Sequence, residues 1–246
     1  MKENNYKTKI GYLLETSLII KIGEILFVFV AAFSLIRLLK PFAGDNLLLQ
    51  QFSVWCANIV MLILIWSGIR LRGQKWSDFG LTCRSINLRQ SLRIFLLSIL
   101  VCILAVTGFI LGSIIMANVT GLTESADMSN YDYLKDNIFM LVLTLVGVYI
   151  VSSFGEEVIY RAFLINRITE LGLDSKFGKM ATVVISAAIF GIVHYKWGPM
   201  GMVQNGFMGL VMGIFYLKLK KKLWILVLAH AYMDTFLMFQ VYMASN

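Results

Sequence analysis

Long uninterrupted apolar runs limit this chain more than any other feature of its sequence. Several of them reach the roughly 20 residues that a helix needs to cross the hydrocarbon core of a bilayer. The composition agrees, because 59% of the 246 residues are hydrophobic and only 15% are charged, whereas a soluble domain has about 25% charged residues. The sequence therefore predicts an all-α, polytopic membrane helix bundle that forms a single integral membrane domain over residues 1–246.

We predict about seven membrane helices. Their expected ranges are 19–38, 47–69, 92–116, 137–160, 179–195, 200–217 and 223–243. No internal repeat and no low-complexity linker divides the chain. The first 15 residues lack a cleavage site of small residues, so the first apolar run is expected to remain as an anchor.

Charged loops predict the orientation of the bundle. Segment 70–93 has six Lys or Arg residues against Asp78 alone, and segment 218–222 reads KLKKK. Segment 117–136 has four acidic residues against Lys135, and within it 123–136 is expected to form a short helix over the outer mouth. Positive loops remain in the cytoplasm, so we predict a multi-pass protein of the cell membrane with its N-terminus in the cytoplasm and its C-terminus outside.

The basic balance and the cysteines indicate little else. A formal net charge of +8 would fit a nucleic-acid partner, but cytoplasmic loops of membrane proteins collect Lys and Arg for topological reasons. We therefore expect membrane lipid as a partner and no nucleic acid. Cys56, Cys83 and Cys102 are far apart and odd in number, which argues against a disulfide framework or a zinc knuckle.

Six ionisable residues stand where lipid should exclude them. Each costs at least ~2.5–3.5 kcal/mol at the centre of a membrane helix, so such residues are functional by default. Once loop charges and residues at helix ends are set aside, Glu156, Glu157, Arg161, His194, His230 and Asp234 remain. Both histidines of the chain are in this group. Together with three carboxylates, they predict a functional site inside the membrane.

Helical spacing separates the two adjacent glutamates. They point about 100° apart on a helix, and Glu157 precedes Arg161 by four residues, the favourable order for an ion pair. Glu156 is then left without a local cationic partner and is available for proton transfer. Ser152 and Ser153, one turn earlier, are interpreted as helix-packing residues.

The two histidines have neighbours four residues away. Asp234 shares a helix face with His230, where it either orients the imidazole or faces the same metal ion or substrate carbonyl. Phe190 shares a face with His194 and is expected to pack against the site. Glu156, His194 and His230 would suit Zn²⁺ with an open fourth position, but the same groups could activate water without a metal. Both alternatives lead to water attack on a carbonyl.

Three motifs resemble one known family. EEVIYR (156–161), FGIVH (190–194) and HAYMD (230–234) are similar, in this order, to the motifs of the CPBP family, the CAAX proteases and bacteriocin-processing enzymes also called Abi. The resemblance covers about 137–243, with its motifs between 150 and 240. It implies an intramembrane endopeptidase that cleaves a membrane-associated peptide or protein and whose site opens toward the cytoplasm.

The resemblance also implies roles for individual residues. Glu156 would activate water, and His194 would be its partner or a metal ligand. His230 and Asp234 would stabilise the oxyanion or complete a metal site, while Glu157 and Arg161 would support Glu156. Eukaryotic CAAX enzymes have Asn in place of Asp234, and an ionised Asp accepts hydrogen bonds but cannot donate them. That difference favours an Asp234 that orients His230 or binds a metal.

Two questions about this resemblance stay open. The compact length indicates a bacterial protein, in which prenylated substrates are not expected. The alternative function is a bacteriocin self-immunity or peptide-signalling regulatory membrane protein that acts by binding. The predicted helix ends also place Glu156 near the inner end of its helix and His194 near the outer end of the next. The two residues can meet only if the fourth helix continues past Arg161.

Overall fold

The chain folds into a bundle of long helices. The computed structural model describes residues 8–82, 86–121 and 127–244, and this part of the chain contains helices and no β-strand. Seven helical spans in it are long and apolar enough to cross a membrane, which confirms the predicted helix bundle. These spans are α2 (Leu18–Ala43), α3 (Leu47–Leu71), α4 (Leu88–Thr120), the continuous helix from α5 to α6 (Ile138–Thr169), α7 (Lys176–Val193), η5 with α8 (Tyr195–Lys218) and α9 (Leu223–Met243).

The fourth span differs most from its prediction, because it continues to Thr169 and does not end near residue 160. It consists of α5 (Ile138–Val148), two π-helical stretches (Tyr149–Phe154 and Glu157–Ile165) and α6 (Asn166–Thr169). The polar residues after 160 are buried and paired within the bundle. For example, Asn166 Nδ2 donates to the hydroxyl of Tyr216 at 2.8 Å. Glu156 therefore lies in the middle part of a long helix.

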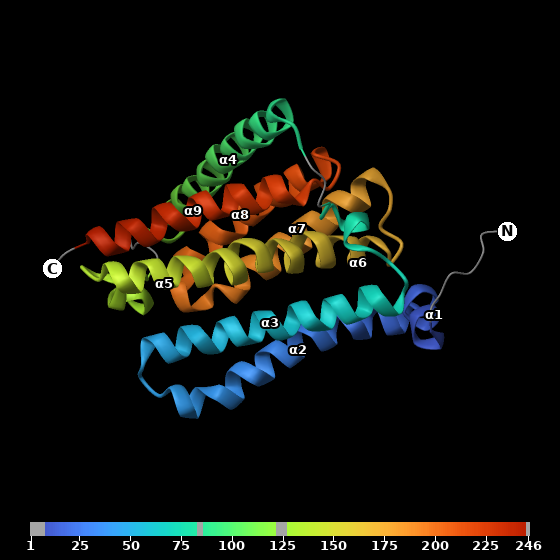
Figure 1. The fold of residues 1–246 in the computed structure, drawn as a ribbon, viewed down its shortest axis with the longest axis horizontal. Helices are drawn as coiled ribbons and strands as arrows, with labels where there is room; N and C mark the ends of the chain where they lie inside the picture. The colour runs from blue at the N-terminus through green and yellow to red at the C-terminus, as the bar shows by residue number, and fades with distance from the viewer. Residues whose placement is uncertain (1–7, 83–85, 122–126, 245–246) are drawn as a thin grey trace.

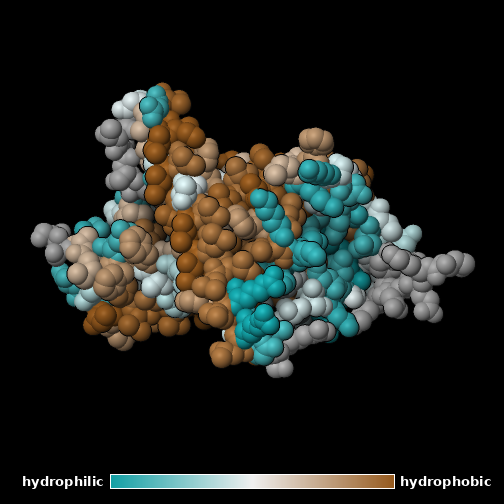
Figure 2. All heavy atoms as spheres, turned by 90° about the horizontal axis from the view of Figure 1, so that it is seen from above, coloured by the Kyte–Doolittle hydropathy of each residue, from teal (hydrophilic) through white to brown (hydrophobic). Residues whose placement is uncertain are grey.

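The two ends of the bundle have different chemistry. The termini lie at opposite ends in Figure 1, with the short helix α1 (Lys9–Thr16) near the N-terminus. We call the end with loops 70–82, 170–175 and 218–222 the basic end. Figure 2 shows hydrophilic residues gathered toward the side where the N-terminus lies and an apolar band across the middle. At the basic end, Arg72 forms an ion pair with Glu24, and Arg167 forms one with Glu170 at 2.8 Å.

The opposite end, which we call the acidic end, consists of segments 44–46, 127–137 and 194–197. Residues Ser129–Leu134 form the 3-10 helix η2 there, which agrees with the short helix expected in 123–136, although 122–126 lie outside the described residues. A second 3-10 helix, η1 (Trp76–Phe79), belongs to the basic end. Cys56 and Cys102 are free thiols, as predicted, and Cys83 lies outside the described residues.

Glycine allows α7 and α8 to approach closely. A Cβ atom built on Gly191 would lie 2.5 Å from the carbonyl oxygen of Met202 on α8, closer than real Cβ contacts. Small residues at helix contacts are the usual means of close packing in membranes. Because α7 ends at Val193 and its cap residue His194 is three residues after Gly191, this contact also fixes the position of the imidazole.

We therefore expect Gly191→Ala to destabilise the protein and to impair the site together. Overpacking of this kind costs typically about 1–3 kcal/mol, which thermal unfolding in detergent would measure. Gly23→Ala is the matched control, because a Cβ atom on Gly23 meets nothing within 4 Å. Equal unfolding temperatures for the two variants would contradict the packing argument.

Candidate active site

A cavity of about 920 Å³ lies inside the bundle, and the predicted catalytic side chains line it. Glu156, His194, His230 and Asp234 all line it, although they come from three different spans. Glu157, Arg161 and Phe190 do not line the cavity and lie in the packed core beside it. The predicted helix ends had placed Glu156 and His194 at different depths. The fourth helix continues past Arg161, so the two residues can lie at the same cavity.

The cavity extends in one direction only. From the site it reaches the acidic end, where Gln50, Asn130, Lys196 and Gln240 line it. None of its lining residues comes from the loops of the basic end. The loop charges predict that this end faces outside, whereas the family resemblance implies a cavity that opens toward the cytoplasm, and both statements stay predictions.

The two adjacent glutamates have opposite surroundings. The Glu156 side chain is 15% exposed and faces the cavity, whereas the Glu157 side chain is 0% exposed. Glu156 stands between the two π-helical stretches of its helix. Such wide turns are rare and occur frequently at functional sites. Only Glu156 of the pair can therefore reach a molecule in the cavity.

The predicted ion pair between Glu157 and Arg161 is present. Arg161 Nη1 lies 2.9 Å from Glu157 Oε1, and both side chains are buried. The guanidinium also lies over the ring of Phe190, 4.5 Å from its centroid. The Phe190 ring in turn packs against the imidazoles of His194 and His230, at centroid distances of 4.7 Å and 6.3 Å. The ion pair and the aromatic ring thus form a support behind both histidines.

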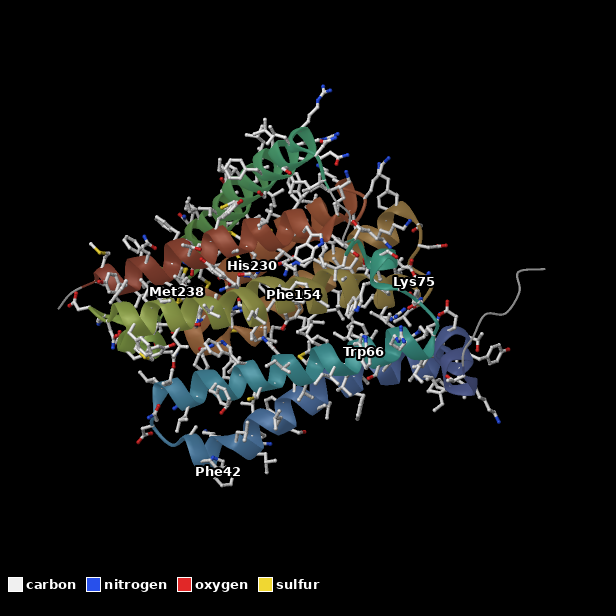
Figure 3. The ribbon with its side chains drawn as sticks, in the orientation of Figure 1. Phe42, Trp66, Lys75, Phe154, His230 and Met238 are labelled. Carbon is white, nitrogen blue, oxygen red and sulfur yellow. The ribbon has the colours of Figure 1, made fainter. Side chains whose placement is uncertain are left out.

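Three carboxylates surround the imidazole of His230, which lies along the middle part of α9 (Figure 3). Its Nδ1 is 2.9 Å from Glu157 Oε1. Its Nε2 lies 3.7 Å from Asp234 Oδ1 and 4.0 Å from Glu156 Oε2. Glu157, from another span, is thus the carboxylate at hydrogen-bond distance from the ring, and Asp234 lies beside the second nitrogen. A water molecule or a substrate oxygen could bridge the gaps on the Nε2 side, because they exceed hydrogen-bond length.

Ser153 is a site residue that the sequence did not reveal. Its side chain is buried between helices, as expected of a packing residue, and its hydroxyl also donates to Asp234 Oδ2 at 2.7 Å. The signal was a hydroxyl nearly one helical turn before Glu156, on the same helix as the catalytic candidate. Because Asp234 accepts this hydrogen bond, its carboxylate is held in place beside His230.

His194 presents one free nitrogen to the cavity. Its Nδ1 lies 2.7 Å from the carbonyl oxygen of Phe190, and a carbonyl can only accept, so Nδ1 bears the proton in this contact. In a neutral ring Nε2 is then an acceptor. Tyr160 also lines the cavity and makes an edge contact with Phe190 at 4.9 Å, another contribution that no motif indicated.

These donor atoms meet only part of what zinc requires. Both imidazoles have Nδ1 held by an oxygen atom, an arrangement common behind metal-ligating histidines. However, among residues 8–82, 86–121 and 127–244 no three His, Cys, Asp or Glu side chains lie close enough together to hold a metal ion. The placement therefore does not form a three-ligand zinc site from Glu156, His194 and His230.

Comparison with known proteins identifies the part of the chain that contains the site. Residues 138–236 match the family model described as type II CAAX prenyl endopeptidase Rce1-like. This match confirms the resemblance to the CPBP family, and the matched segment includes all three motifs. No curated protein and no solved structure matches the chain with significance.

Proposed function

We propose that this chain is an intramembrane endopeptidase that hydrolyses a peptide bond of a membrane-associated peptide or protein. Its residues 138–236 match the family model for Rce1-like endopeptidases. The observation that supports the proposal is the meeting of Glu156, His194, His230 and Asp234 in one cavity within the membrane-spanning part of the bundle. A family likeness by itself would support a peptidase only broadly.

Glu156 is the proposed general base. Its carboxylate is the one that reaches the cavity from this helix, and it accepts a proton from a water molecule as that water attacks the carbonyl carbon of the scissile bond. His194 Nε2, a hydrogen-bond acceptor, holds the second hydrogen of the same water. After attack, Glu156 returns the proton to the nitrogen of the leaving amine, and the C–N bond breaks.

His230 is the proposed donor to the developing oxyanion. Glu157 holds Nδ1, so a doubly protonated ring still has its Nε2 proton to offer on the cavity side. Donors fixed in advance around the oxyanion supply a large part of catalysis in water-excluded sites. Asp234, held by Ser153, keeps the ring in position and accepts hydrogen bonds only.

The cleavage reaction itself is the first test. The purified protein in detergent is expected to cut an apolar peptide with polar ends, and mass spectrometry of the products would show hydrolysis at one bond. A peptide that binds and remains intact would contradict the protease and support the alternative role in immunity or peptide signalling, in which the same cavity acts by binding.

Metal removal is a separate prediction. Because no three ligands are preformed, we propose that water is activated by Glu156 without a resident zinc ion. Cleavage is then expected to be unchanged after treatment with a strong chelator and dialysis, and elemental analysis should find zinc well below one ion per chain. Loss of cleavage that added Zn²⁺ restores would contradict the metal-free mechanism.

A further inference from the structure

The position of the reactive groups along the bundle indicates how a substrate reaches them. His230 is seven residues from the start of α9 at the basic end and thirteen from its end. At 1.5 Å per residue these distances are about 11 Å and 20 Å. His230 is therefore nearer to the basic end, His194 belongs to segment 194–197 of the acidic end, and the cavity extends from His230 toward that acidic end. Figure 3 shows this order, with Lys75 at one end of the bundle, His230 between and Met238 toward the C-terminus.

Packed core closes the short route to the basic end. From Val158 to Ile168 every residue of the fourth span is buried, and Leu223, Ile225, Leu226 and Val227 of α9 are buried opposite it. Apart from Tyr160, which borders the site, none of these residues lines the cavity. A peptide could not pass this layer without separating the helices, so the basic end offers no entrance.

The long route is open and mostly apolar. Between the site and the acidic end the walls are formed by side chains such as Phe33, Trp55, Phe109, Met233 and Leu237. At the mouth the lining becomes polar. We call Gln50, Asn130, Lys196 and Gln240 the polar rim. Lys196 donates to Gln50 across it at 3.3 Å. This sequence of surfaces fits a peptide with an apolar stretch followed by a polar segment.

We infer that the substrate enters from the acidic end as an extended apolar segment, with its polar continuation at the polar rim. This inference rests on the proposed protease function. The ten residues of α9 between His230 and Gln240 span about 15 Å, which an extended chain covers in about four to five residues. The scissile bond thus lies about that far inside the apolar stretch. The substrate class is a peptide or membrane span that reaches the cavity at the acidic end, the end that the loop charges predict to be outside.

The first experiment moves the polar boundary of the substrate. In a series of peptides the apolar stretch is shortened by one residue at a time, so that the polar segment begins one residue earlier in each peptide. Mass spectrometry then locates the bond that is cut. The cut is expected to follow the boundary at a distance of about four to five residues. A cut that stays at one bond wherever the boundary lies would overturn the inferred register.

The second experiment blocks one end at a time. Ser129→Cys places a thiol on exposed η2 next to the polar rim, and Ser77→Cys places a matched thiol on exposed η1 at the basic end. Each variant is treated with a bulky maleimide, and the parent chain, with its own three cysteines, gives the background. Labelling at 129 is expected to lower cleavage about tenfold or more, since it covers the entrance of a concave site, while labelling at 77 leaves cleavage at the parent level.

The outcomes separate the two proposals. If no unlabelled protein cleaves any peptide, the protease function fails. If the unlabelled variants cleave, but labelling at 77 blocks and labelling at 129 does not, the function stands and the inferred entrance is wrong. In sealed vesicles an impermeant maleimide should reach position 129 from the outer side only, and labelling from the inner side would overturn the assigned side.

Discussion

Glu156→Gln is expected to abolish cleavage while leaving the fold unchanged. The amide keeps the size of the side chain but cannot accept a proton from water, and general-base catalysis typically contributes about 10²–10⁴-fold to a rate. Stability should change little, because the side chain is partly exposed to the cavity and its single ion pair in the described part of the chain is the 4.0 Å contact with His230.

The measurement compares kcat and unfolding temperature for the parent and the variant in the same detergent. Retained cleavage in Glu156→Gln would remove the proposed general base. The variant also separates catalysis from binding in cells. If the chain protects its host by binding a toxin, cells that express Glu156→Gln should remain protected, whereas a role that depends on proteolysis should be lost with cleavage.

The sequence predicted the site because charge is costly in lipid. Removal of loop charges left six ionisable residues, and four of them line the same cavity. The seven spans could be predicted equally well from the sequence, since about 20 apolar residues in a row allow few alternatives to a membrane helix. Both rules, the cost of a charge in lipid and the length of an apolar run, apply to single residues or contiguous segments. A single sequence is therefore sufficient to predict these features.

Features that depend on contacts between spans could not be predicted in this way. Arg161, Asn166 and Arg167 resemble the start of a loop in sequence, but each is buried and paired, so the helix continues to Thr169. Polarity alone does not distinguish a residue in water from one that has an internal partner. The same limitation applies to His230, because its helical spacing indicated Asp234 as a neighbour but could not indicate Glu157, which contacts the ring from another span.

The end of the bundle at which the cavity opens could not be predicted from the loops, for a related reason. Loop charges indicate which end of the bundle faces the cytoplasm, but they contain no information about where helices separate. The cavity reaches the acidic end, and the side of the membrane that this end faces stays a prediction. The basic end is closed because the side chains between Val158 and Ile168 pack against α9. Such packing between spans cannot be read from the charges of the loops.

Glu157→Gln is expected to destabilise the protein strongly, in contrast to the same change at its neighbour. Glu157 is fully buried, and its Oε1 lies 2.9 Å from both Arg161 Nη1 and His230 Nδ1. Removal of its charge leaves the guanidinium of Arg161 in the core without its counter-ion. Breaking a buried pair by removing one partner costs about 3–5 kcal/mol, a large share of the 5–15 kcal/mol that typically separates folded from unfolded protein.

The double variant Glu157→Leu with Arg161→Met distinguishes a structural role from a catalytic one. Replacing a buried ion pair by apolar residues of similar volume is often neutral or stabilising, so its unfolding temperature should return toward that of the parent. Cleavage should stay low, because His230 still lacks the oxygen that holds Nδ1. Recovery of both properties would mean that Glu157 only stabilises the helix and does not orient His230, and failure to recover stability would mean that the ion pair does not account for the loss.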